Sequence, residues 1–156
     1  MILDAHGVRL ELPGAWSGHL FERDRLVGMH AASYPVALAD TSTFGDQSTG
    51  RMRSGQAFVA LVEYRPGNGL AAGHGLFAPR RIELPLDPMS FSPRRLAHAR
   101  PGQVGTQQFF TAADRPFCAY VVLAGDRAQR RRAIAAVDRL LRSLRVTPRV
   151  VEDSGR

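Results

Sequence analysis

The segment that most constrains the fold runs from Gly125 to Val146. Its apolar residues recur every three or four positions, so it predicts one amphipathic helix, closed by a short strand. Asp126 lies where an N-cap side chain accepts hydrogen bonds from free backbone N–H groups. A helix with a single apolar face must cover another element, and residues 117–123 just before it are apolar enough to form a buried strand. The apolar positions of the helix are Ile134, Val137, Leu141 and Leu144.

Several shorter segments of the N-terminal half predict strands. Residues 8–12 alternate apolar and charged side chains, and Pro13-Gly14 then marks a turn. Residues 19–23 and 27–34 follow after similarly short connections, so the three segments are expected to pair as an antiparallel meander. Residues 57–64 are apolar on both faces, which is typical of a central strand.

A short helix is expected to begin near Asp46 and to run towards Arg53, with Phe44 and Met52 as its apolar anchors. A sheet whose central strands are apolar on both faces also needs a cover on the face that the long helix leaves open. The short helix, the proline-rich segment or a second copy of the chain could supply this cover. We favour a cover from the same chain.

The segment 66–103 contains six prolines and predicts irregular chain, with short strands near 81–84 and 96–100. Residues 104–111 and 117–123 then predict a β-hairpin, because two apolar runs flank a short polar connection.

Strands first and a helix last predict the α+β class: a single twisted antiparallel sheet, with a long C-terminal helix packed across one face and a short second helix. The length of 156 residues and the hydrophobic content of 44% fit one globular domain with a real core. We expect this domain to span residues 1–150, with an edge strand within 144–150 and a disordered tail at 151–156.

Composition narrows the cellular setting. No apolar run approaches the roughly 20 residues that span a bilayer, and the N-terminus has no secretory signal pattern, so we expect a cytoplasmic protein without a transmembrane segment. The single cysteine, Cys118, excludes an internal disulfide and a multi-cysteine zinc site. Its apolar neighbours predict an inert buried thiol.

The net charge of +7 comes from arginine alone. All 21 basic residues are arginine and none is lysine, which fits the codon bias of a GC-rich bacterial genome. A positive charge of this size raises non-specific affinity for polyanions, but codon bias explains the composition without nucleic-acid binding. We therefore disfavour a nucleic acid as the partner.

Motifs for catalysis, metals and cofactors are absent from the sequence. The five histidines have no ligand spacing, and no Gly-x-Ser-x-Gly nucleophile motif occurs. The glycine-rich stretch 67–75 is not followed by the helix that a dinucleotide-binding loop needs, so it predicts a surface loop. His30, within a strand, is interpreted as a hydrogen-bonded structural histidine. We expect neither a metal nor a cofactor.

Clusters of arginine are the remaining candidates for a binding surface. A guanidinium presents a planar fork of donors that matches carboxylate and phosphate. The cluster at the start of the long helix opposes the positive end of the helix dipole, which marks either a binding surface or a solvated face. The candidate binding residues are Arg80, Arg81, Arg127, Arg130 and Arg131.

Three stretches in order carry a family resemblance. The first is Val8-x-Leu10-x-Leu12-Pro13-x-x-Trp16, the second is the central strand 58–64, and the third is Leu140-Leu141-x-Ser143-Leu144-Arg145-Val146. Their order resembles that of small PsbP-like domains, and this resemblance implies a sandwich of sheet and helix that binds proteins or envelope components and brings no catalytic residue. The chain is also similar to uncharacterised proteins of GC-rich actinobacteria, through its stretches at 58–64 and 105–110.

We therefore expect a non-enzymatic domain that binds a protein partner or a ligand, and a homodimer is compatible with this view. The expected contacts are the 40–55 loop, the 66–80 loop and the arginine-rich start of the long helix. One alternative is a small hydrolase or isomerase whose site is assembled from separated loops, with Glu63, His30 or His74 as acid–base groups. Another is an arginine-mediated polyanion binder, whose affinity falls steeply with salt.

Overall fold

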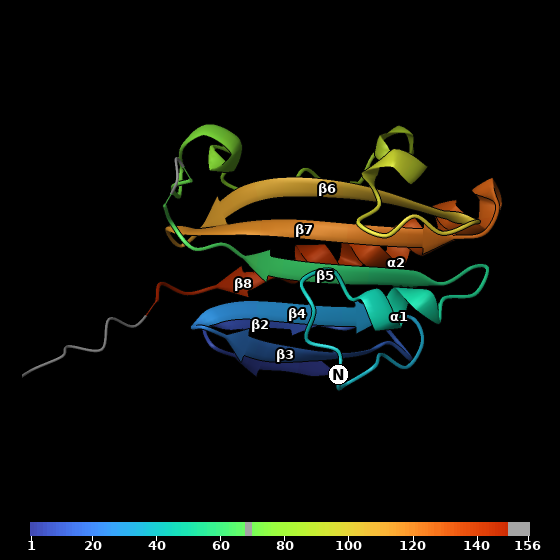
Figure 1. Ribbon diagram of the computed structural model, residues 1–156, viewed down its shortest axis with the longest axis horizontal. Helices are drawn as coiled ribbons and strands as arrows, with labels where there is room; N and C mark the ends of the chain where they lie inside the picture. The colour runs from blue at the N-terminus through green and yellow to red at the C-terminus, as the bar shows by residue number, and fades with distance from the viewer. Residues whose placement is uncertain (68–69, 150–156) are drawn as a thin grey trace, which may run out of the picture.

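The computed structural model describes residues 1–67 and 70–149 (Figure 1). In this part of the chain, eight strands form two antiparallel sheets, and a long helix, α2 (Arg127–Arg142), lies across one face of the larger sheet. The fold is α+β, as predicted, and the short second helix is present as α1 (Asp46–Gly50). None of the described helices is long and apolar enough to cross a membrane.

The larger sheet has the strand order β3-β4-β5-β7-β6. The strand β5 lies between β4 and β7, which confirms the prediction of a central strand. The predicted hairpin is also confirmed: β6 and β7 are joined by a tight turn in which Ala113 and Asp114 have φ of 50° and 60°, a conformation that matches the twist of paired strands. The five strands are β3 (Ser17–Arg23), β4 (Leu26–Ala32), β5 (Ala57–Glu63), β6 (Gln103–Ala112) and β7 (Arg115–Ala124).

The smaller sheet joins the two ends of the described chain. Its order is β1-β2-β8, with β1 (Ile2–Ala5), β2 (Val8–Glu11) and β8 (Arg145–Val146). The strands therefore form two sheets where a single sheet was predicted. The strand β8 is the expected edge strand, although it is shorter than 144–150, and residues 150–156 lie outside the described residues.

The predicted meander is wrong at its first step, because β2 pairs with β1 and β8 and not with β3. The burial of β2 gives the reason. Val8 and Leu10 are fully buried in the core that α2 shares with the larger sheet, so the strand lies over this core and not beside β3. A turn in which Trp16 N donates to the Pro13 carbonyl then leads the chain into the larger sheet and buries Trp16.

The helix α2 forms as predicted and begins with a capping box. The backbone N–H of Gln129 donates to Asp126 Oδ1 (2.8 Å), and the Asp126 N–H donates to Gln129 Oε1 (2.9 Å). Gly125 makes room for this arrangement: its φ is +107°, and a Cβ there would lie 2.3 Å from Gln129 Oε1. The buried side chains of α2 include Ile134, Val137, Leu140 and Leu141, which pack on the larger sheet.

The opposite face of the larger sheet is covered by the same chain, as favoured from the sequence. Phe44 and Met52, the predicted anchors, pack against its buried side chains, and the rings of Phe44 and Tyr120 lie 5.0 Å apart between centroids. The Tyr34 hydroxyl donates to the Ser48 carbonyl at 2.7 Å, which holds α1 in place on this face.

The proline-rich segment is irregular, as predicted, but the short strands expected near 81–84 and 96–100 are wrong. Glu83 N donates to the side-chain Oε1 of Gln108 (2.8 Å), and Ala97 N donates to the Tyr120 hydroxyl (2.9 Å). These donors are satisfied by side chains and not by the backbone of a neighbouring strand. Among its described residues, three single-turn 3₁₀ helices occur instead, η1 (Gly75–Phe77), η2 (Pro88–Ser90) and η3 (Pro93–Arg95).

A buried ion network ties the two sheets together. Arg115 on β7 donates to both carboxylate oxygens of Glu63 on β5, at 2.8 and 3.1 Å. Its other terminal nitrogen donates to the carbonyls of His6, in the turn between β1 and β2, and of Thr147, just after β8. Arg149 also pairs with Glu63. Burial by itself raises the pKa of Glu63, but the hydrogen bonds from Arg115, Val27 and Arg149 lower it below its ordinary value.

Candidate functional site

Residues 80–91, here called the strap, lie along one side of α2. The hydrogen bond from Leu86 to the buried Asp138 fixes the strap near the middle of the helix. The first part of the strap lines a cavity with the end of α2, and its last part lines another cavity with the start of α2. The strap and the helix therefore run antiparallel, with a cleft at each end of their contact.

The N-terminal cleft lies between the end of the strap and the first half of α2. It has a volume of about 460 Å³. Its apolar walls come from Met89 and Phe91 of the strap, Leu123 of β7 and Ile134 of α2. Three of the predicted binding residues form its charged rim, and these are Arg127, Arg130 and Arg131.

The C-terminal cleft lies between the start of the strap and the end of α2, with a volume of about 420 Å³. Its apolar walls include Leu84, Phe110 and Leu141. The charged rim contains the two other predicted binding residues together with two arginines from the end of α2 and from β8. These four are Arg80, Arg81, Arg142 and Arg145.

All five predicted binding arginines thus meet on one surface, which we call the arginine flank: the strap, the side of α2 that faces it, and both clefts. Within residues 1–67 and 70–149, no carboxylate oxygen lies within 4.0 Å of any of the seven rim guanidinium groups. Their side-chain hydrogen bonds in this range go only to backbone carbonyls, from Arg130 to Asp126 and from Arg145 to Arg142 and Leu144. The flank therefore presents seven guanidinium groups without a direct carboxylate partner around apolar hollows, although the strap also carries the exposed Glu83 and Asp87.

Sequence reasoning missed Arg142 and Arg145 as members of this surface. The helical repeat held a signal for the first, because Arg131 and Arg142 are eleven residues apart, close to three full turns, and so project from the same side of α2. No such signal existed for Arg145, because it lies in β8, beyond the end of the helix.

The two loops predicted as contacts occupy different places. The 40–55 segment covers the face of the larger sheet that lies opposite α2. Its Asp40 is buried and accepts hydrogen bonds from Ser42 and Gln47. Within the 66–80 loop, residues 68 and 69 lie outside the described residues, and Arg80 belongs to the C-terminal cleft.

The acid–base residues of the enzyme hypothesis are held in separate settings. Glu63 is paired with Arg115 and Arg149, and His74 is exposed. His30 is fully buried with its Nε2 2.8 Å from the Ser42 carbonyl oxygen, the hydrogen-bonded structural role expected for it. Glu63 lines a cavity of about 130 Å³ to which neither histidine contributes.

Metal-ligand and thiol chemistry find no support in this part of the chain. Among the described residues, no three His, Cys, Asp or Glu side chains form a group able to hold a metal ion. Cys118 is buried, and burial raises the pKa of its thiol to about 12, so it stays protonated and inert.

Comparison with known proteins yielded no match to a family model, to a curated protein or to a solved structure. The resemblance to PsbP-like domains therefore stays a prediction.

Proposed function

We propose that this protein is a non-enzymatic binding domain that holds an acidic, amphipathic segment of a partner protein on its arginine flank. One observation carries the proposal: seven arginines surround two apolar clefts on the same side of α2, with no carboxylate within 4.0 Å in the described chain. A partner that brings carboxylates and apolar side chains together matches both parts of this surface.

The charge distribution supports a negative partner. Arg127, Arg130 and Arg131 crowd the start of α2, where the helix dipole already has its positive end, and the first turn contains no acidic residue. Such crowding costs folding free energy, which the Asp126 carboxylate at the N-cap offsets only in part. Carboxylates of a partner would compensate it through charge-assisted, two-pronged hydrogen bonds.

The apolar walls favour a peptide segment over a purely charged polyanion. A phosphate backbone gives apolar clefts nothing to bury, whereas large apolar side chains gain free energy by leaving water there. Ile134 and Leu141, one in each cleft, are seven residues apart, which corresponds to about 10 Å along a helix axis. Two apolar anchors spaced by seven residues in a helix, or by three in an extended strand, span about this distance.

A peptide-display selection against the immobilised full chain tests the proposal. We expect enrichment of peptides that combine Asp or Glu with two large apolar residues at one of these spacings. Their affinity should fall at least tenfold for Arg130→Glu/Arg131→Glu, because reversed charges repel the peptide carboxylates. The matched control is Arg94→Glu/Arg95→Glu, an exposed arginine pair that lines neither cleft.

Two results would overturn the proposal. One is a selection that yields uncharged or basic peptides. The other is a set of acidic peptides that bind the Arg130→Glu/Arg131→Glu and Arg94→Glu/Arg95→Glu variants equally well.

A further inference from the structure

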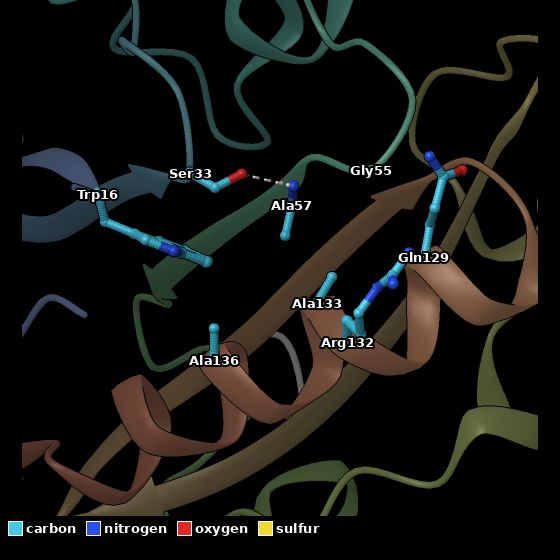
Figure 2. Close-up of a pocket in the computed structure, with 8 residues that line it drawn as sticks. All are labelled: Trp16, Ser33, Gly55, Ala57, Gln129, Arg132, Ala133 and Ala136. Carbon is cyan, nitrogen blue, oxygen red and sulfur yellow. Dashed lines mark hydrogen bonds between the residues drawn. The ribbon is translucent and has the colours of Figure 1, made fainter. Parts of the chain in front are cut away.

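A further hollow lies on the other side of α2 from the strap (Figure 2). Its volume is about 320 Å³, and it lies between the N-terminal half of α2, the residue that precedes β3 and the chain around the start of β5. Gln129, Ala133 and Ala136 face it from α2 and are offset by about half a turn from the arginine flank. A ligand here would leave both arginine-rimmed clefts open, so this site is independent of the proposed function.

The inner wall of this hollow is apolar and partly aromatic. Trp16, which is only 8% exposed, presents its indole to the hollow, and the methyl groups of Ala133 and Ala136 point into it from the helix (Figure 2). Ala57 at the start of β5 completes the wall. Because these three facing residues are alanines, space remains in front of the indole.

The polar groups at the rim are donors. Ser33 Oγ accepts from the Ala57 N–H at 3.0 Å, which leaves its own hydrogen free to donate (Figure 2). Gln129 Oε1 already accepts the Asp126 N–H in the capping box, so the side-chain amide nitrogen of Gln129 is the group that can donate to a ligand. The Arg132 side chain makes no hydrogen bond or ion pair within the described chain, so its whole fork of donors is available.

We infer that this hollow binds a small aromatic carboxylate. Its ring would lie against Trp16 between the alanine methyl groups, where aromatic pairs favour offset or edge-on contact. Its carboxylate would accept hydrogen bonds from Arg132, with Gln129 and Ser33 as further donors. The volume suits a small ligand, since pockets for drug-sized ligands begin at roughly 300 Å³.

The single tryptophan supplies a direct test, because Trp16 is the only one in the chain. Phenylacetate is titrated into the full-length protein while the tryptophan fluorescence is recorded. We expect a saturable change, at least tenfold weaker binding of the neutral phenylacetamide, and at least tenfold weaker binding of phenylacetate to Arg132→Gln. The matched control, Arg139→Gln, removes an exposed arginine of the same helix that lines no described cavity and should bind as the wild type does.

Ala136→Leu provides a second readout, since it fills the hollow without a change of charge and should abolish the fluorescence response. The inference is overturned if phenylacetate gives no saturable change, if phenylacetamide binds equally well, or if Arg132→Gln and Arg139→Gln bind alike. The Arg130→Glu/Arg131→Glu variant should retain phenylacetate binding, which separates this site from the arginine flank.

Discussion

Among single residues, Arg115 has the largest predicted effect on stability. It is 4% exposed and connects β5, β7, the turn after β1 and the segment after β8 through one guanidinium. Arg115→Met should lower the free energy of unfolding by about 3 to 5 kcal/mol, because it leaves the buried Glu63 carboxylate with fewer partners. Denaturant unfolding measures this loss.

The control for that measurement is Arg94→Met, an exposed arginine whose replacement should change the free energy of unfolding by no more than about 0.5 kcal/mol. If Arg115→Met proved as stable as Arg94→Met, the ion network would not hold the sheets together.

His30 predicts a pH dependence of stability. Burial lowers its pKa below the ordinary value of 6.5, although the hydrogen bond with the Ser42 carbonyl opposes this shift. At a pH between these two pKa values, the unfolded chain binds more protons than the folded chain. Neutral His30 therefore contributes its full stabilisation of the fold above about pH 6.5. This stabilisation is lost as the pH falls towards the lower pKa of the folded state. The free energy of unfolding should therefore decrease from pH 7.5 to 5.5.

His30→Gln should reduce this decrease, whereas His74→Gln, at an exposed position, should leave it unchanged. Urea unfolding at several pH values gives both slopes. A slope that is the same in wild type and His30→Gln would remove His30 as its cause.

Among the elements, the strap depends on one buried hydrogen bond to α2. Asp138→Leu removes the acceptor of the Leu86 N–H and should lower the free energy of unfolding by about 1 to 3 kcal/mol, because a buried donor is left unsatisfied. Asp138→Asn keeps an acceptor oxygen and should cost less. Denaturant unfolding compares them, and equal stability of both variants and the wild type would show that this contact does not hold the strap.

The elements that the sequence predicts well are those with local signals. The period of Ile134, Val137 and Leu141, together with the cap at Asp126, is sufficient to predict α2. The distribution of strands between two sheets is different, because β2 pairs with β8 through Val8 and Val146, far apart in the chain. No local pattern reveals this pairing, and the alternation in β2 is equally compatible with β3 as its neighbour.

In the whole molecule, the candidate site also combines local signals, which the sequence shows, with long-range contacts, which it does not show. The arginine clusters are visible in the sequence, but their convergence depends on the path of the strap, whose regular structure is limited to the single turn of η2. The hydrogen bond between Leu86 and Asp138 sets that path and joins residues 52 positions apart. The sequence therefore shows where arginines cluster along the chain, and only the tertiary fold brings these clusters together on one surface around two clefts.

NMR mapping can show whether the arginine flank binds an acidic, amphipathic segment. The amide signals of ¹⁵N-labelled protein are followed while an acidic peptide from the selection is added. We predict that the shifts concentrate in the strap, in 127–134 and in 141–146, and that they vanish in Arg130→Glu/Arg131→Glu. Shifts confined to β3 and β4, or unchanged in that variant, would contradict the claim.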